Sequence, residues 1–305
     1  MRDVSAATSS DAADRILTLP DSRHLGYREY GDATGRPVVA LHGTPGSRFK
    51  YSGSHEAAAA VGLRLIAIDR WGYGLSSVKP GAKLAEYGAD VAVLADALGL
   101  ATFQVTGVSG GAPFAVAVAA HMKNRVTGLA LVSPVGPLSG SAGNVKLSPF
   151  HVVCFRVLPR IPRAIAAVFL AYRGGLKIAP NWAMWLAVSR SASVDRRVMS
   201  DPKSRSRLIE AFSNGLHDSV RGPVIDMTLF GQSWGLDFSS ITARTCVWIG
   251  TNDRNVPSTA VEGLIAAIPH CQAVVIPGAG HSWVANNADV IMNWLANPAN
   301  ELTRR

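Results

Sequence analysis

The sequence predicts an α/β fold, in which a mostly parallel β-sheet is flanked by helices. Short apolar runs alternate with alanine-rich helical stretches along most of the 305 residues. This order is typical of parallel strands joined by helical crossovers. The composition, 48% hydrophobic and 17% charged, provides a large core and excludes disorder as the main state. The length fits one large domain or two ordinary ones.

Eight segments have strand character. The first two, Arg15–Leu19 and His24–Tyr30, flank a short turn and predict a hairpin. The other six are mostly apolar runs, of which Pro37–Leu41 is continuously apolar, as expected of a strand buried on both faces. These six are Pro37–Leu41, Leu63–Ile68, Thr102–Val108, Val126–Val132, Thr245–Ile249 and Ala273–Ile276. Helices are predicted at Leu84–Leu98, Ala112–His121, Thr259–Ala267 and Asp289–Leu295.

The alternation of strands and helices breaks once. From Pro134 to Phe238 no strand-like run recurs, and the helical pattern is interrupted by Pro and Gly. The simplest interpretation is one sheet domain with a helical segment inserted after its sixth strand. We therefore expect an α/β domain made of residues 1–133 and 239–305, with a helical cap over residues 134–238.

The segment Gly107-Val108-Ser109-Gly110-Gly111 fits the pattern G-x-S-x-G where a strand is followed by a helix. A sharp turn of this kind lifts the Ser side chain above the sheet and needs small neighbours, here Gly107 and Gly111. The alternative, a nucleotide-binding turn, requires the spacing G-x-G-x-x-G, which this segment does not have. Ser109 is therefore a candidate nucleophile, which needs a base to take its proton.

The carboxyl ends of parallel strands share one edge of the sheet, so partners of Ser109 should follow other strands. His281 follows the last predicted strand, and Asp253 follows the strand that ends near Gly250. Alone, each has a structural explanation: a loop histidine for His281, and an Asx-turn or helix N-cap for Asp253. With Ser109 they predict a triad, His281 as the base and Asp253 as the acid that orients it.

An oxyanion hole needs two backbone amides. One candidate is Gly110, directly after Ser109. The other is Thr44, in a loop of small residues, including Gly43, that follows the third predicted strand. We expect His42 to fasten this loop by hydrogen bonds rather than to act as a base.

Five motifs in this order resemble the α/β-hydrolase superfamily. They are LHGTPGS (41–47), DRWGYGLSS (69–77), GVSGGAP (107–113), GTNDRNVP (250–257) and GAGHSW (278–283). They span nearly the whole chain outside the insertion and keep the family order Ser, Asp, His. The resemblance implies the α/β-hydrolase fold, with an eight-stranded, mostly parallel sheet and a helical cap after strand six. It also implies an acyl-enzyme on Ser109 that water activated by His281 hydrolyses, with no cofactor or metal.

The resemblance leaves the substrate open. The main hypothesis is a carboxylesterase or lipase-like enzyme that cleaves a small or medium apolar ester. Carbon–carbon bond hydrolases, aminopeptidase-like hydrolases and cofactor-free haloperoxidases are similar enough to remain alternatives. A ligand-binding or signalling protein on the same scaffold is a further one. Ser109 at the elbow argues against dehalogenases and epoxide hydrolases, which carry Asp there, and the HGTPG loop argues against proline iminopeptidases.

The net charge of +9 is concentrated in the predicted cap. Residues 134–238 hold thirteen basic and six acidic side chains, which leaves two charges of the total elsewhere. A solvated outer face, peripheral membrane contact through Cys154–Arg173, and recognition of a negatively charged substrate all explain this excess. Nucleic acid is not an expected partner, because no motif that reads DNA or RNA is present.

A cytoplasmic location is expected. Met1–Pro20 reads as a polar tail without the apolar run of a secretory signal, and Ala164–Tyr172 is too short to span a bilayer. The three cysteines are widely spaced and form no CxxC motif, as expected of reduced thiols. The oligomeric state is left open.

Overall fold

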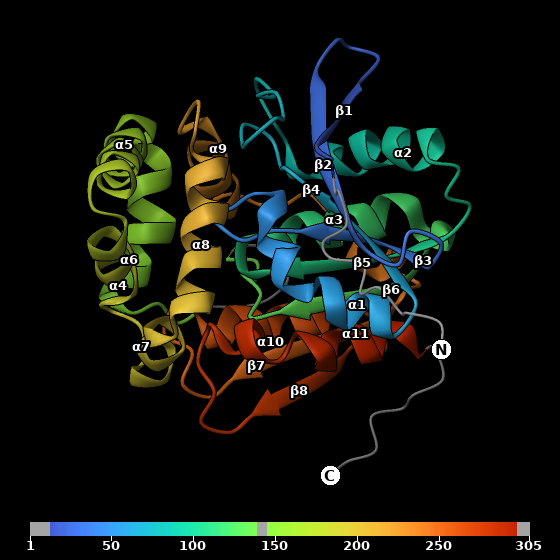
Figure 1. The fold of residues 1–305 in the computed structure, drawn as a ribbon. Helices are drawn as coiled ribbons and strands as arrows, with labels where there is room; N and C mark the ends of the chain where they lie inside the picture. Colours follow the sequence, from blue (N-terminus) through green and yellow to red (C-terminus); the bar gives the residue numbers. More distant parts are fainter. Residues whose placement is uncertain (1–12, 139–144, 298–305) are drawn as a thin grey trace, which may run out of the picture.

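The computed structural model describes residues 13–138 and 145–297. Most of the polar tail predicted at Met1–Pro20 lies outside these residues. The stretch 139–144 of the predicted cap lies wholly outside them. The described chain forms one sheet, with helices packed on both faces and further helices at one end (Figure 1).

The sheet has eight strands in the order β1-β2-β4-β3-β5-β6-β7-β8. Strands β1 and β2 form the predicted hairpin, β2 pairs antiparallel with β4, and all pairs from β4 through β8 are parallel. This confirms the predicted eight-stranded, mostly parallel sheet. The strands are β1 (Arg15–Thr18), β2 (His24–Gly31), β3 (Arg36–Leu41), β4 (Leu63–Ile68), β5 (Phe103–Val108), β6 (Val126–Val132), β7 (Arg244–Gly250) and β8 (Gln272–Ile276).

Side chains that alternate along each central strand serve two cores. In β3, Val39 and Leu41 pack with α2, α3 and α10 on one face, whereas Val38 and Ala40 pack with α1 and α11 on the other. Both faces are covered, which explains why apolar residues predominate on both sides of these strands rather than alternating with polar ones. The helices are α1 (His55–Ala60), α2 (Tyr87–Ala97), α3 (Ala112–Met122), α10 (Ser258–Ala267) and α11 (Ala288–Ala296).

Among the described residues, six α-helices lie between β6 and β7 in the chain, and we call them the helical insert. They are α4 (Pro149–Val152), α5 (Pro162–Ile178), α6 (Pro180–Val188), α7 (Ser193–Ser200), α8 (Pro202–Gly215) and α9 (Arg221–Phe230). In Figure 1, α4, α5 and α6 are outermost, and α8 and α9 lie between them and the sheet. Proline occupies the first turn of α5, α6 and α8, where no amide donor is needed.

Short helical turns connect several elements. Two of them carry parts of the site: η1 (Arg48–Ser54) and η3 (Ser109–Gly111). The others are η2 (Leu84–Glu86), η4 (Lys123–Arg125), the π-helical η5 (Val153–Val157), η6 (Leu158–Arg160), η7 (Phe238–Ser240) and η8 (Trp283–Asn286).

Candidate active site

Ser109 lies on a tight turn between β5 and η3. Its φ is +53°, in the left-handed region, which costs a non-glycine residue about 1–3 kcal/mol. The turn packs closely against its surroundings: a Cβ on Gly111 would lie 2.3 Å from the Leu41 carbonyl oxygen, and one on Gly107 2.8 Å from the Ala112 Cα. The two glycines are therefore required by close backbone approach, as the elbow motif predicts.

Three side chains from separate loops form one hydrogen-bonded chain. The Ser109 Oγ is 3.0 Å from Nε2 of His281, and Nδ1 of His281 is 2.8 Å from Oδ2 of Asp253. The second Asp253 oxygen accepts the backbone N–H groups of Asn255 and Val256. A carboxylate that faces Nδ1 places the proton there, which leaves Nε2 free to accept the hydroxyl proton of Ser109.

The charges of the hydrogen-bonded groups Asp253 and His281 support each other. Burial alone would raise the pKa of Asp253, but His281 and two backbone amides outweigh it and hold that pKa below its ordinary value. Burial disfavours the charged form of His281 as well, yet the Asp253 carboxylate raises the pKa of His281 above 6.5. An imidazolium formed by proton transfer from Ser109 is therefore stabilised in place.

The loop after β3 is tied down by His42. Its Nε2 accepts the backbone N–H of Arg70 (3.1 Å), so the proton is on Nδ1, which donates to the Gly43 carbonyl (2.8 Å). His42 is fully buried, and burial lowers its pKa well below 6.5, so it stays neutral. His42 fastens the loop, and its hydrogen bonds within the described residues go to Gly43 and Arg70 rather than to Ser109.

The two predicted oxyanion residues lie against each other. A Cβ on Gly110 would be 2.2 Å from the Thr44 hydroxyl, and one on Gly43 would be 3.3 Å from the Ser109 Cβ. The loop after β3 therefore approaches the start of η3 as an oxyanion hole requires.

A buried ion pair from the helical insert holds the Thr44 side chain. Asp226 of α9 is 1% exposed and binds the Arg70 guanidinium through both of its oxygens. The same carboxylate accepts the hydroxyl of Tyr73 (2.7 Å) and that of Thr44. Arg70 also donates to the Gly43 carbonyl (3.0 Å), so one network joins α9 to the loop after β3.

A second insert carboxylate holds the loop of His281. Asp195, in the first turn of α7, is 1% exposed and accepts the backbone N–H groups of His281 (3.1 Å) and Ser282 (2.7 Å). It comes so close to Gly280 that a Cβ there would lie 2.4 Å from a carboxylate oxygen. Asp195 therefore positions the backbone of the candidate base.

The sequence did not identify Asp195 or Asp226. The only signal in the sequence is that acidic side chains are scarce, since residues 134–238 contain six of them and thirteen basic ones. The structure then shows that Asp195 and Asp226 are buried. Neither lies in a motif, and both act on loops far away in the chain, so their role becomes visible only in the fold.

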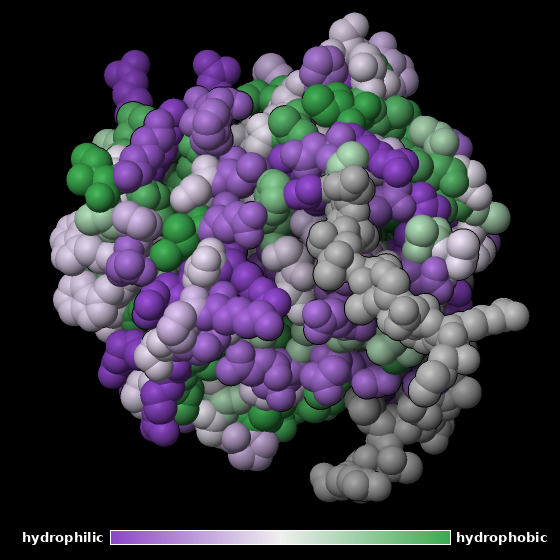
Figure 2. All heavy atoms as spheres, viewed as in Figure 1, coloured by the Kyte–Doolittle hydropathy of each residue, from purple (hydrophilic) through white to green (hydrophobic). Residues whose placement is uncertain are grey.

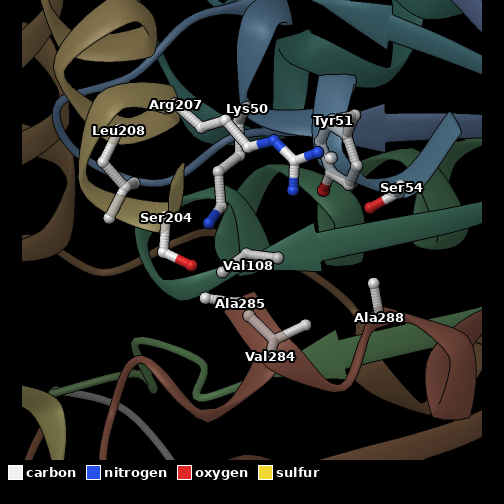
Figure 3. Close-up of a pocket in the computed structure, with 11 residues that line it drawn as sticks. Lys50, Tyr51, Ser54, Val108, Ser204, Arg207, Leu208, Val284, Ala285 and Ala288 are labelled. Atoms are coloured by element: carbon white, nitrogen blue, oxygen red, sulfur yellow. The ribbon is translucent and has the colours of Figure 1, made fainter. Parts of the chain in front are cut away.

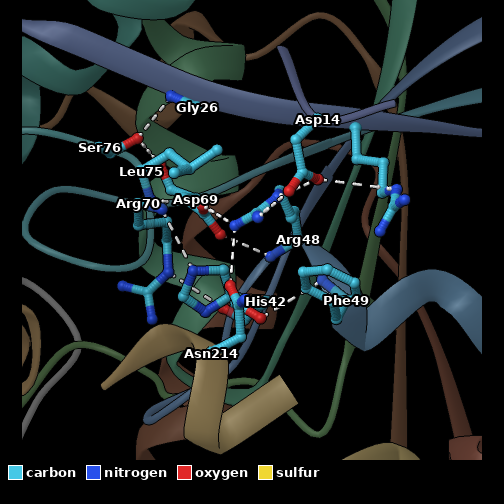
Figure 4. Close-up of polar contacts among 12 residues, drawn as sticks. Asp14, Gly26, His42, Arg48, Phe49, Asp69, Arg70, Leu75, Ser76 and Asn214 are labelled. Atoms are coloured by element: carbon cyan, nitrogen blue, oxygen red, sulfur yellow. Dashed lines mark hydrogen bonds and ion pairs between the residues drawn. The ribbon is translucent and has the colours of Figure 1, made fainter. Parts of the chain in front are cut away.

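A further polar cluster, around Arg48 and Asp69, lies next to His42 of the loop after β3 (Figure 4). The guanidinium of Arg48 donates to Asp69 (2.6 Å) and to the Asn214 side chain on α8 (2.8 Å). The backbone N–H of Arg48 also donates to Asp69 (2.7 Å), which is fully buried. These bonds attach η1 to both the end of β4 and the helical insert.

Within residues 13–138 and 145–297, no group of three or more His, Cys, Asp or Glu side chains is arranged to hold a metal ion. The described cysteines form no disulfide. The groups of the site suit three chemical tasks: proton transfer by an oriented histidine, attack by a serine, and stabilisation of an oxyanion.

Comparisons with known proteins agree with this geometry. A family model described as alpha/beta hydrolase fold matches residues 36–287. Over 281 residues the chain is 24% identical to a non-heme haloperoxidase from Rhodococcus erythropolis, covering 90% of this chain and 96% of that protein.

Two solved structures cover nearly the whole chain. An alpha/beta hydrolase fold protein from Nakamurella multipartita has a TM-score of 0.67 and 25% identity, with 94% of this chain and 98% of that one covered. A thermophilic esterase from Thermogutta terrifontis has a TM-score of 0.69 and 22% identity, with 95% and 100% covered. With its sheet, its strand order and its matched family model, the chain belongs to the α/β-hydrolase fold family.

Proposed function

We propose that the protein is a serine hydrolase that cleaves a small or medium apolar carboxylic ester through an acyl-enzyme on Ser109. The observation that carries the proposal is the unbroken chain of hydrogen bonds from Ser109 through His281 to Asp253. A structural serine needs neither an oriented imidazole nor a buried carboxylate behind it.

In the acylation step, Nε2 of His281 takes the hydroxyl proton while Oγ of Ser109 attacks the ester carbonyl carbon. Asp253 stabilises the resulting imidazolium. The tetrahedral intermediate collapses when His281 gives its proton to the leaving alkoxide, and the alcohol departs. Water then attacks the acyl-enzyme, with His281 again as the base, and releases the acid and free Ser109.

The developing oxyanion is assigned to the backbone amides of Gly110 and Thr44. Support comes from the close approach of these two residues and from the Asp226 carboxylate, which fixes the Thr44 side chain. An apolar group beside the scissile bond is favoured because the Phe230 ring lies against Gly110, 3.0 Å from where a Cβ would be.

The test is turnover of p-nitrophenyl esters of graded chain length, combined with fluorophosphonate labelling. Ser109→Ala should lower kcat by about 10⁶-fold and abolish labelling, because the nucleophile is removed. The matched control is Ser239→Ala, at an exposed serine outside the site, which should behave as wild type. Undiminished ester turnover in Ser109→Ala would refute the proposal.

A second candidate function is attack on the acyl-enzyme by hydrogen peroxide instead of water, which would release a peracid. The names of relatives favour it, since two proteins that match about 90% of this chain are non-heme haloperoxidases or chloroperoxidases. With bromide present for the peracid to oxidise to hypobromous acid, bromination of a reporter dye that requires acetate, peroxide and Ser109 together would support this activity. Its absence alongside rapid ester hydrolysis would leave water as the acceptor.

The remaining alternatives make different predictions. A carbon–carbon bond hydrolase would be inert toward esters but would cleave a vinylogous diketone. An aminopeptidase-like enzyme would release the amine from an aminoacyl anilide. A binding or signalling protein would bind its ligand equally well as wild type and as Ser109→Ala, without releasing a product.

A further inference from the structure

A small pocket lies beside the candidate triad, where η1, α8 and the segment after His281 meet (Figure 3). Its cavity is about 50 Å³, room for a group the size of a few water molecules. Val108 and Val284 line its floor, and the side chains of Lys50 and Arg207 reach into it from the opposite side.

The pocket is adjacent to the reacting groups. Val108 directly precedes Ser109, and Val284 is three residues after His281. The Lys50 ammonium is close enough to lower the pKa of His281, which opposes part of the rise that Asp253 causes. The pocket therefore lies beside the segments that carry Ser109 and His281.

Two cations face this pocket without a counter-charge. Within the described residues, neither the Lys50 nor the Arg207 side chain makes a hydrogen bond or ion pair, and no acidic side chain lines the cavity. Neighbouring arginines differ in this respect: Arg48 binds Asp69 and Asp14, and Arg70 binds Asp226. Arg207 packs instead on Gly53, where a Cβ would be 2.9 Å from its guanidinium nitrogen.

The surroundings of Lys50 favour an anionic ligand. Burial lowers the pKa of Lys50 to about 8, because the ammonium has lost water without gaining a partner. The nearby hydroxyls are already engaged: Ser204 donates to Asn286, and Tyr51 donates to the Leu41 carbonyl. A bound anion would restore the lost electrostatic stabilisation of both cations.

We propose that this pocket binds the carboxylate of an ester substrate whose ester group reaches Ser109, so that the preferred substrate is a half-ester of a short dicarboxylic acid. The inference rests on the proposed function and refines its substrate class. The apolar floor accommodates the methylene chain, while Lys50 and Arg207 bind the charged end. A guanidinium and an ammonium match the two oxygens of a carboxylate.

The test compares two esters that differ only at the far end: monomethyl glutarate, and methyl valerate, which has a methyl group in place of the carboxylate. Hydrolysis is followed by titration of released acid. Wild type should favour the glutarate half-ester in kcat/KM by about tenfold or more. Lys50→Met and Arg207→Met should each lower this ratio by about tenfold or more, as loss of a charge-assisted hydrogen bond predicts. The control is Lys203→Met, an exposed lysine on α8 that does not line the pocket.

Binding tests the pocket independently of catalysis. Calorimetry with glutarate and Ser109→Ala should show saturable binding that is lost when Lys50→Met or Arg207→Met is added. If no ester is hydrolysed and Ser109 is not labelled, the proposed function fails, but glutarate binding still decides the pocket. Equal kcat/KM for the two esters, or no glutarate binding, would overturn the inference. Binding of inorganic phosphate but not of glutarate would overturn the carboxylate assignment.

A second inference concerns the outer face of the helical insert, the exposed surface of residues 149–190. Large apolar side chains are exposed there, with Ile178, Trp182 and Trp185 at 88%, 58% and 60%. The others are Phe150, Val153, Val157, Ile161, Val168, Leu170 and Leu186. In Figure 2 green, pale and purple spheres alternate along the left edge, over the helices of the insert. An apolar surface of this extent marks an interaction site.

The charge on this surface has one sign. No acidic residue occurs between Asp96 and Asp195 in the sequence. The region instead carries basic residues at Lys146, Arg156, Arg160, Arg163, Arg173, Lys177 and Arg190. On α5, the exposed Val168 and Leu170 lie between the exposed Arg163 and Lys177, so apolar and basic side chains share the exposed surface of this helix.

The charge decides between possible partners. A symmetric dimer would place this face against its own copy, and the basic residues would repel one another. Nucleic acid would leave the exposed aliphatic side chains without an apolar partner. An anionic bilayer provides both negative headgroups and an apolar interior, and Trp side chains are favoured at its boundary.

We infer that the outer face of the helical insert docks on an anionic lipid bilayer. The contact is peripheral, since no helix in the described parts of the chain is long and apolar enough to cross a membrane. Both signals that stable attachment needs, basic charge and inserted apolar side chains, are present on one surface.

The experiment is co-sedimentation with vesicles of pure phosphatidylcholine or of phosphatidylcholine with 30% phosphatidylglycerol. Wild type should bind the anionic vesicles at least tenfold more tightly, with a blue shift of tryptophan fluorescence, and binding should weaken with salt. Trp182→Ser/Trp185→Ser and Arg160→Gln/Arg163→Gln should each reduce binding about tenfold or more, since each basic residue near the surface contributes measurably. The control is Ile16→Ser, at an exposed apolar side chain on β1.

Equal binding to both kinds of vesicle, or none, would overturn the inference. Concentration-dependent dimerisation that Trp182→Ser/Trp185→Ser abolishes, without vesicle binding, would assign the face to a second copy of the chain instead.

Discussion

His281 illustrates how one side chain is set by groups from three elements. Asp253, in the loop after β7, orients the ring and stabilises its charge, and Asp195 of α7 holds its backbone. Both carboxylates raise the pKa of His281, whereas burial and Lys50 work against them. The net result is a raised pKa, so the imidazole becomes protonated at a higher pH than an ordinary histidine.

This shift predicts the acid limb of the pH profile. Protonated His281 cannot take the Ser109 proton, so kcat/KM should fall as the pH is lowered through a pKa above 6.5. Asp253→Asn should move this limb to lower pH, because the imidazolium loses its carboxylate, and should reduce kcat by roughly 10⁴-fold. Initial rates of ester hydrolysis from pH 5 to 9 measure both effects.

The control for that profile is Asp32→Asn, at a turn carboxylate that bonds only to Thr34 among the described contacts. It should leave the limb in place. An acid limb at or below the ordinary histidine value in wild type would contradict the assignment of His281 as the base.

At the scale of elements, the helical insert contributes to the site as well as adjoining it. Helix α7 delivers Asp195 to the loop of His281, and α9 delivers Asp226 to the loop of Thr44. The two loops that carry the candidate base and a proposed oxyanion donor are thus held by helices from another part of the chain. A displacement of the insert would disturb both.

Asp195→Asn tests this arrangement. The amide keeps the size of the side chain but places an N–H donor against one of the two backbone N–H groups, so the His281 loop should shift. We expect kcat/KM to fall about 10- to 100-fold, as small displacements of a catalytic group do. The acid limb should also move to lower pH, because Asp195 raises the pKa of His281.

The pH readout separates positioning from general destabilisation. Asp218→Asn, at an exposed carboxylate of the same insert, is the control and should change neither quantity. An Asp195→Asn variant that loses activity while the acid limb of its pH profile stays unchanged would argue for a merely structural role of Asp195.

At the scale of the whole molecule, the insert is joined to the sheet domain through buried polar contacts. Arg70 and Asp226 are both almost fully buried, and their pair links the segment after β4 to α9. Arg48 and Asn214 make a second link, between η1 and α8. Removing one member of a buried pair leaves the other charge without a partner, which costs more than the pair contributes.

The Arg70–Asp226 pair therefore predicts non-additive stability. Asp226→Leu alone should lower the free energy of unfolding by about 3–5 kcal/mol, because the Arg70 guanidinium stays buried without a carboxylate. In Arg70→Met/Asp226→Leu the loss should be smaller than the sum of the two single losses by more than about 1 kcal/mol. Urea unfolding of the four proteins provides the values, and additive losses would show that the charges do not interact.

Much of the fold followed from local pattern. The predicted strand Pro37–Leu41 is observed as Arg36–Leu41, and Thr102–Val108 as Phe103–Val108, because a strand covered on both faces is mostly apolar and is therefore recognisable in the sequence. The short helix α1 was not predicted, since its six residues are too few to show a helical period. The predicted cap was described only as helical, and how its helices pack depends on contacts that no local pattern contains.

Ser109, Asp253 and His281 could be named as candidates from the sequence because each lies in the turn or loop that follows a strand, and parallel strands bring their carboxyl ends to one edge. Glycines around Ser109 were recognisable for a similar reason, since the turn itself demands them. Asp195, Asp226, Lys50 and Arg207 were decided only by the tertiary structure. Their function depends on burial and on partners distant in the chain, and a charged residue in a helical segment looks the same whether it faces water, a loop or a pocket.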